Sequence, residues 1–246
     1  MRGTTATYLR RGLGLAIAGY AVYAAGAWLR YGRPRPASPD ERDPLLDRFL
    51  PEYEVAERHS IRVHAPAETT LAAASQLDLQ GSPLVRAIFD TRRWLLGSER
   101  EVRQPLGLLA DMQSLGWRVL AESPGREIVV GAITQPWKAD VVFRCPPPEA
   151  FREDRRPNHV KIVWTLRADP LGPSDSMFRT ETRVATTDAR ARRRFRRYWA
   201  MFSAGIIVIR QIMLGEVKRA AERSVRAAAP VTFASPARKP PHLDSV

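Results

Sequence analysis

The longest apolar pattern of the chain lies near its C-terminus, between Asp188 and Ala228. Its apolar positions recur at steps of three and four residues, which keeps them on one face of a helix. Thr186, Thr187 and Asp188 carry the short side-chain oxygens that cap a helix start. The apolar face consists of Phe195, Trp199, Phe202, Ile206, Ile209 and Met213. The pattern predicts a long helix that covers a sheet, a membrane or a ligand.

Short β-prone runs separated by turn residues fill much of the preceding chain. Short turns between most of them favour antiparallel pairing, and alternation within them predicts one covered face and one face in water. In the last run, Thr180 and Thr182 share a face with Phe178 and Val184, so their hydroxyls are expected on the covered side. The predicted strands are Glu57–Val63, Gly116–Glu122, Glu127–Thr134, Trp137–Arg144, Val160–Ala168 and Ser176–Thr186.

Two shorter helices are predicted between the first strand and the others. Pro66 precedes an alanine-rich segment, Ala67–Leu77, and Ser82 with Pro83 precedes Leu84–Leu96. Proline is tolerated in the first helical turn and serine caps helix starts, so both segments carry a start signal.

An uncharged apolar run, Gly12–Leu29, lies between arginines near the N-terminus. A membrane-crossing helix needs about 20 predominantly apolar residues. Residues 1–30 are therefore predicted to form a single-pass membrane anchor, on an undetermined side because the flanking arginines nearly balance. Two alternatives stay open: a secretory signal cleaved near Ala25-Gly26-Ala27, and a buried helix of a soluble domain.

Proline punctuates the segments on either side of the predicted folded domain. Residues 31–51 combine prolines with charges, which is typical of a semi-stiff linker between membrane and domain. Residues 52–228 are expected to form the domain, and residues 229–246 a disordered tail.

The chain is strongly basic, with a net charge of +13 in 246 residues. Such a charge is compatible with nucleic-acid or acidic-membrane partners, but nearly all of it is arginine. Its densest part is the Arg190–Arg197 face at the start of the long helix. A solvated helix surface is the favoured interpretation of this face, and anionic lipid headgroups, acidic partners or nucleic acid remain alternatives.

Catalytic and metal-binding motifs are not found in the sequence. There is no nucleophile elbow, zinc-protease helix, Walker loop or dinucleotide-binding loop. The histidines are scattered, and Cys145 is the single cysteine. Glu181 is interpreted as a cross-strand partner of arginines rather than a general base. These observations predict no metal site, no cofactor and no catalytic residue.

Two segments resemble a known superfamily. Ile61–Leu71 reads Ile-Arg-Val-His-Ala-Pro-Ala-Glu-Thr-Thr-Leu, and Trp164–Asp188 includes Thr-Leu-Arg-Ala-Asp-Pro and Arg-Thr-Glu-Thr-Arg-Val-Ala-Thr-Thr-Asp. In this element order they resemble the START-like, or SRPBCC, superfamily of polyketide cyclases and lipid-transfer proteins. The resemblance implies an α+β helix-grip fold, in which a curved antiparallel sheet wraps around the C-terminal helix and leaves a hydrophobic cavity.

A ligand-binding role follows as the leading hypothesis. The chain is expected to be a membrane-anchored domain that binds a hydrophobic small molecule or lipid without covalent chemistry. A cyclase or aromatase using Thr180, Thr182 and Tyr198, and a docking module using the Arg190–Arg197 face, are the alternatives. The predicted cavity residues are Trp117, Trp137, Phe143, Trp164, Phe178, Thr180, Thr182, Tyr198, Trp199 and Phe202.

Overall fold

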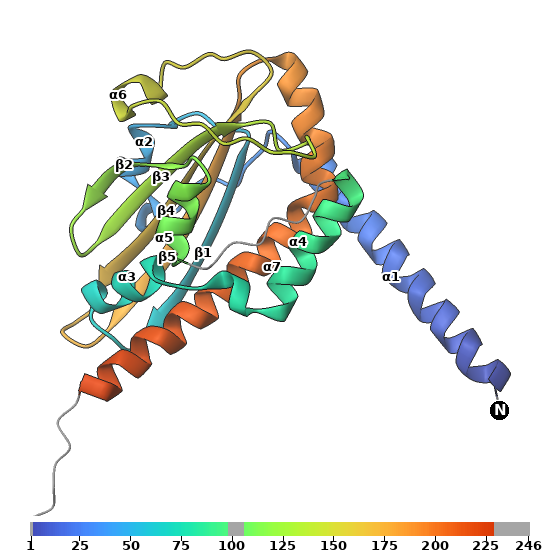
Figure 1. Cartoon of the computed structure of the whole chain (residues 1–246), viewed down its shortest axis with the longest axis horizontal. Helices are drawn as coiled ribbons and strands as arrows, with labels where there is room; N and C mark the ends of the chain where they lie inside the picture. The colour runs from blue at the N-terminus through green and yellow to red at the C-terminus, as the bar shows by residue number, and fades with distance from the viewer. Residues whose placement is uncertain (1, 98–105, 229–246) are drawn as a thin grey trace, which may run out of the picture.

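A five-stranded antiparallel sheet with helices on both faces organises the computed structural model, which describes residues 2–97 and 106–228 (Figure 1). The predicted tail lies outside the described residues. The strands are β1 (Val55–Val63), β2 (Arg118–Ser123), β3 (Glu127–Thr134), β4 (Val160–Pro170) and β5 (Ser176–Thr186). The α-helices are α1 (Arg2–Arg30), α2 (Pro44–Asp47), α3 (Ala67–Ser75), α4 (Pro83–Leu96), α5 (Leu108–Ser114), α6 (Pro148–Phe151) and α7 (Ala189–Ala228). Short 3-10 helices occupy Pro39–Glu41 and Leu79–Gly81.

The strand order is β1-β5-β4-β3-β2, with every neighbouring pair antiparallel. This confirms the predicted antiparallel sheet, but the predicted strand Trp137–Arg144 is wrong. Only an isolated bridge between Ile133 and Arg144 forms there. β4 pairs with one edge of β3 over its whole length, and β2 pairs with the other edge from Glu127 to Gly131, so only the end of β3 is left for this bridge. Trp137 and Phe143 consequently lie in a connection.

The first face of the sheet is covered by α7, as the apolar helix pattern predicts. The Asp188 carboxylate caps the helix by accepting a hydrogen bond from the Ala191 amide at 2.7 Å. Along the C-terminal half of the helix, Met213 and Val217 join a buried core with Phe178 of β5. Figure 1 shows α7 running along the sheet, with α3 at one end of it.

The second face of the sheet is also covered, which corrects the prediction of a face in water. Residues of the expected linker pack there: Leu46, Phe49 and Leu50 are buried in a cluster with Val163 and with Phe151 of α6. Asp43 fixes the start of α2 by accepting from the Leu46 amide at 2.9 Å. The segment that contains α2 is therefore part of the folded domain rather than an extended spacer.

Helix α1 contacts the first half of α7 and then extends away from the domain (Figure 1). The Tyr23 hydroxyl lies 3.0 Å from the Ser203 hydroxyl, and the Tyr20 hydroxyl donates to the Met201 carbonyl. Many apolar side chains of α1 are exposed, including Val22 at 74%. The anchor at Gly12–Leu29 stays a prediction.

By length and composition, α7 is apolar enough to cross a membrane, and it alone has this property among the described residues. Its apolar face lies against the sheet, so core packing explains that composition equally well.

Candidate functional site

The contact between α7 and the sheet has two buried clusters, separated by a stretch of the helix that contains no buried residue. Near the start of the helix, Phe195 and Trp199 pack with Tyr31, Val55 and Val184. Near its end, the second cluster gathers around Met213, Leu214, Val217 and Ala221. Within α7, none of residues 204–212 is buried. We call the region between α7 residues 204–212 and the facing strands the central gap.

Polar groups gather on the sheet side of the central gap. The Trp164 indole nitrogen on β4 donates to the Thr180 hydroxyl on β5. Two positions along β5, the Thr182 hydroxyl accepts a hydrogen bond from Arg210 Nη2 at 3.0 Å. The Arg210 guanidinium lies over the Trp164 ring, 4.0 Å from its centre. The predicted Thr180 and Thr182 hydroxyls do point to the covered side, and an arginine joins them there.

His59 on β1 lies beside the same group of side chains. Its Nδ1 is 2.9 Å from Gln211 Nε2, whereas its buried Nε2 has no hydrogen-bond partner among the described residues. Burial first, and then the charge of Arg210, lower the pKa of His59, so the ring is neutral at pH 7. Glu57 Oε2 lies 3.9 Å from His59 Nε2, and burial raises the pKa of that carboxyl.

The aromatic residues predicted to line a cavity are distributed over three places. Phe178 lies in the buried core and Trp199 in the cluster at the start of α7. Tyr198 and Phe202 pack together with ring centres 4.9 Å apart, and Trp117 and Phe143 do so at 5.3 Å, next to β2. Trp137 is half-buried against the N-terminal cluster, and its buried indole nitrogen has no partner among the described residues.

Arg210 and His59 were missed in the sequence. Arg210 stands four residues after Ile206 and three before Met213, so it occupies the inward face of α7 within an otherwise apolar stretch. A single charge at an inward helical position is the signal that identifies it. His59 belongs to an alternating strand, where its position alone carries little information.

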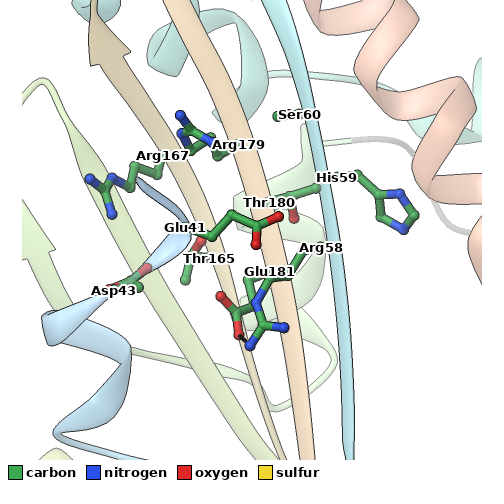
Figure 2. A pocket seen from close by; sticks show the side chains of 10 residues that line it. All are labelled: Glu41, Asp43, Arg58, His59, Ser60, Thr165, Arg167, Arg179, Thr180 and Glu181. Carbon is green, nitrogen blue, oxygen red and sulfur yellow. Dashed lines mark ion pairs between the residues drawn. The ribbon is translucent and has the colours of Figure 1, made fainter. Parts of the chain in front are cut away.

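The other face of the sheet carries buried ion pairs. Figure 2 shows Arg58 and Glu181 among the side chains of this face, while His59 points away toward α7. Glu181 Oε1 lies 2.8 Å from Arg58 Nη2 and 2.7 Å from Arg183 Nε, which confirms the predicted cross-strand role of Glu181. The hollow beside Arg58 and Glu181 measures about 40 Å³, room for only a few water molecules. This cluster is built for packing rather than for binding a ligand.

A second buried acid lies nearby on β3. Burial, followed by a hydrogen bond and the charge of Asp43, raises the pKa of Glu127 to about 8. The two carboxyl groups belong to different elements, since Asp43 caps α2 and Glu127 begins β3. Their contact therefore joins the N-terminal segment to the sheet.

Metal and thiol chemistry find no support in the described part of the chain. It contains no group of three histidine, cysteine or acidic side chains that could hold a metal ion. Burial raises the pKa of Cys145 to about 11, which keeps the thiol protonated at neutral pH.

The fold defines a class: an α+β protein whose five-stranded antiparallel sheet is covered by a long C-terminal helix. No family model and no curated protein matches the sequence. Among solved structures, the chain is similar to the ZhuI aromatase/cyclase from Streptomyces sp. R1128, with 16% identity, a TM-score of 0.30, and coverage of 72% of this chain and 99% of that one.

Two further solved structures are similar at the same level. CalU16 from Micromonospora echinospora has 14% identity and a TM-score of 0.25, and covers 70% of this chain and 86% of its own. TTHA0849 from Thermus thermophilus has 13% identity and a TM-score of 0.26, with 72% of this chain and 100% of that one covered. At these values, the likeness assigns neither a family nor an activity to this chain.

Proposed function

We propose that this protein binds a hydrophobic small molecule or lipid non-covalently in the central gap, while α1 holds the domain at a membrane. The observation that carries the proposal is the burial pattern of α7. Buried clusters lie on both sides of residues 204–212, and none of residues 204–212 is itself buried. Protein interiors are ordinarily close-packed, so a stretch without buried residues between two buried clusters is the place where we put the guest.

The anchor is proposed on the exposed apolar surface of α1. Leu15, Ile17, Val22 and Leu29 are each more than half exposed, at 75%, 61%, 74% and 69%. Insertion into a lipid bilayer would remove these apolar side chains from water, which is favourable. The contacts of Tyr20 and Tyr23 with α7 support a retained helix over a cleaved signal, because cleavage would remove them.

The cyclase-type alternative has less support from the geometry. Its three proposed groups are engaged with different partners: Thr180 with Trp164, Thr182 with Arg210, and Tyr198 with Arg92, whose Nε lies 3.3 Å from the phenol oxygen. The docking alternative is weakened in a similar way, since Arg196 of the Arg190–Arg197 face donates to the Trp28 carbonyl of α1.

Filling the central gap tests the proposal. Ile206 is half-buried beside the N-terminal cluster, whereas Val208 is 39% exposed on the same helix. We expect Ile206→Trp to remove the lipids or apolar compounds that co-purify with the full chain, as measured by native mass spectrometry and extraction. Val208→Trp is the matched control and should retain them. A wild-type chain that carries no guest and binds no apolar probe would overturn the proposal.

A further inference from the structure

The central gap contains a positive charge that no acid among the described residues neutralises. Arg210 is half-buried on the inward side of α7, and no carboxylate of the described residues lies within 4.0 Å of its guanidinium. Burial alone lowers its pKa to about 9, so the group is still charged at neutral pH. A buried charge is costly unless a counter-charge or several hydrogen bonds compensate it.

The hydrogen bonds of Arg210 compensate little of that cost. A guanidinium has five N–H donors, and in the described structure Arg210 uses one toward Thr182 and one toward the weak acceptor Met213 Sδ at 4.0 Å. The Trp164 ring covers one flat side of the group. The Trp164 ring therefore fixes the plane of the guanidinium, and the N–H donors that do not bond Thr182 lack a strong acceptor among the described residues.

The neighbouring titratable groups do not supply the missing negative charge. His59 is neutral, and Glu57 faces His59 rather than Arg210. Glu57 is also the register partner of Thr182, but the ion-pair contact of its carboxylate in the described residues is with His59. Lys218 and Arg219, further along α7, are paired with Glu222 and Glu216 at the surface. Arg210 thus differs from its neighbours in having an inward position and no acid.

We infer that the ligand of the central gap is an apolar molecule with one carboxylate, which accepts hydrogen bonds from the edge of the Arg210 guanidinium. This inference rests on the proposed function, which by itself requires only an apolar guest. A planar guanidinium matches a carboxylate with two parallel hydrogen bonds. One buried positive charge balances one negative charge, which favours a monoanion over a phosphate dianion. The aromatic and aliphatic residues around the gap would contact the apolar body.

Two probes of equal shape separate the inference from the proposed function. Naphthalene-2-carboxylate and its uncharged amide share an aromatic body and differ in charge. We expect the full-length wild-type chain to bind the carboxylate about 10-fold to 100-fold more tightly than the amide in calorimetric titrations, because charge-assisted hydrogen bonds are the stronger kind. Arg210→Met should abolish this preference and still bind the amide. Arg219→Met, an exposed arginine of the same helix, should leave the preference unchanged.

The possible outcomes distinguish the carboxylate inference from the proposed function. Equal binding of both probes by the wild-type chain would overturn the carboxylate inference and support the proposed function. Binding of neither probe would overturn both. The wild-type ratio does not depend on any variant, so it stands if Arg210→Met fails to fold, which a thermal melt would reveal. A preference that survives Arg210→Met in a folded chain would assign the anion to another cation and overturn the inference.

Discussion

Glu181 is held between two buried guanidinium groups on the second face of the sheet. Its side chain is 7% exposed, and those of Arg58 and Arg183 are 6% and 2% exposed. Removing one partner of a buried ion pair leaves the other charge uncompensated. Glu181→Gln should lower the free energy of unfolding by about 3–5 kcal/mol, measured by denaturant titration.

The control for this change is a surface ion pair. Glu216 lies 2.7 Å from Arg219 on α7, where the two side chains are 36% and 59% exposed. Solvent screens such a pair, so Glu216→Gln should change the free energy of unfolding by less than about 1 kcal/mol. Equal effects of the two substitutions would show that the buried Glu181 ion pairs stabilise the fold no more than a surface ion pair does.

Gly131 of β3 lies next to the side chains of Leu120 on β2 and Phe151 on α6. A Cβ atom at this position would lie 3.1 Å from Phe151 Cε2 and would overlap the Leu120 side chain. Overpacking of this kind typically costs about 1–3 kcal/mol, so Gly131→Val should lower the free energy of unfolding by that amount and lower the unfolding midpoint with it. Gly172→Val is the matched control, since a Cβ there has no neighbour within 4 Å. If both variants melt alike, the contact with α6 is looser than the structure has it.

Single residues were predictable where a period constrains them. The inward direction of Thr180 and Thr182 follows from alternation in β5, and the cap at Asp188 follows from side-chain chemistry. The hydrogen-bond partner of Thr182 could not be predicted, because alternation tells which face of the sheet a side chain is on but not which distant residue reaches it. Arg210 reaches it from 28 positions along the chain, and only folding brings the two together.

At the scale of elements, α2 is attached to β3 through Asp43 and Glu127. The folded state keeps Glu127 protonated up to about pH 8, while an unfolded glutamate loses its proton near its ordinary pKa of 4.5. Between these values the folded state binds more protons, so stability must fall as pH rises. Glu127→Gln should remove this dependence and make the protein more stable than wild type at pH 9 by about 1–3 kcal/mol.

Denaturant titrations of both chains at pH 5, 7 and 9 would measure that difference. Identical slopes of stability against pH for wild type and Glu127→Gln would contradict the assignment. Above pH 8, the protection of the α2 amides relative to their intrinsic exchange rate should also fall in the wild-type chain alone, because ionised Glu127 repels the Asp43 carboxylate where α2 meets the sheet.

Most elements were predictable, because their apolar periods and caps are local. One exception, Trp137–Arg144, has the alternation of a strand, yet β2 and β4 already pair with both edges of β3 from Glu127 to Gly131. Strand pairing is a property of the whole sheet, and a local pattern does not contain it. The packing of the N-terminal segment was missed for a related reason: prolines suggested an extended linker, while Leu46 and Phe49 between them supply the buried contacts.

For the molecule as a whole, the anchor is the feature most directly testable. Ile17→Arg combined with Val22→Arg places charges on exposed apolar positions of α1, at an insertion cost of about 2.5–3.5 kcal/mol per arginine. We expect the double variant to leave the membrane fraction of lysed cells. Leu171→Arg, an exposed apolar site in the turn after β4, should stay in it.

Two results would count against the anchor. A double variant that sediments with membranes as fully as wild type would contradict it directly. A mature chain beginning after Ala27, identified by intact mass, would instead establish the cleaved-signal alternative. In either case the central gap would need another route to apolar guests.

With α1 as the proposed anchor, its junction with α7 would set the orientation of the domain relative to a bilayer. Arg196 donates to the Trp28 carbonyl and lies 4.1 Å from the centre of the Trp28 ring, and Tyr31 packs edge-on against Phe195. A domain on a flexible linker samples every orientation relative to the bilayer, whereas a domain that packs against a rigid membrane helix keeps one orientation. The residues from Gly12 to Trp28 span about 24 Å of helix at 1.5 Å each. The same flank of the domain would then always meet the lipid surface, and exchange of guests would depend on that surface rather than on chance encounters.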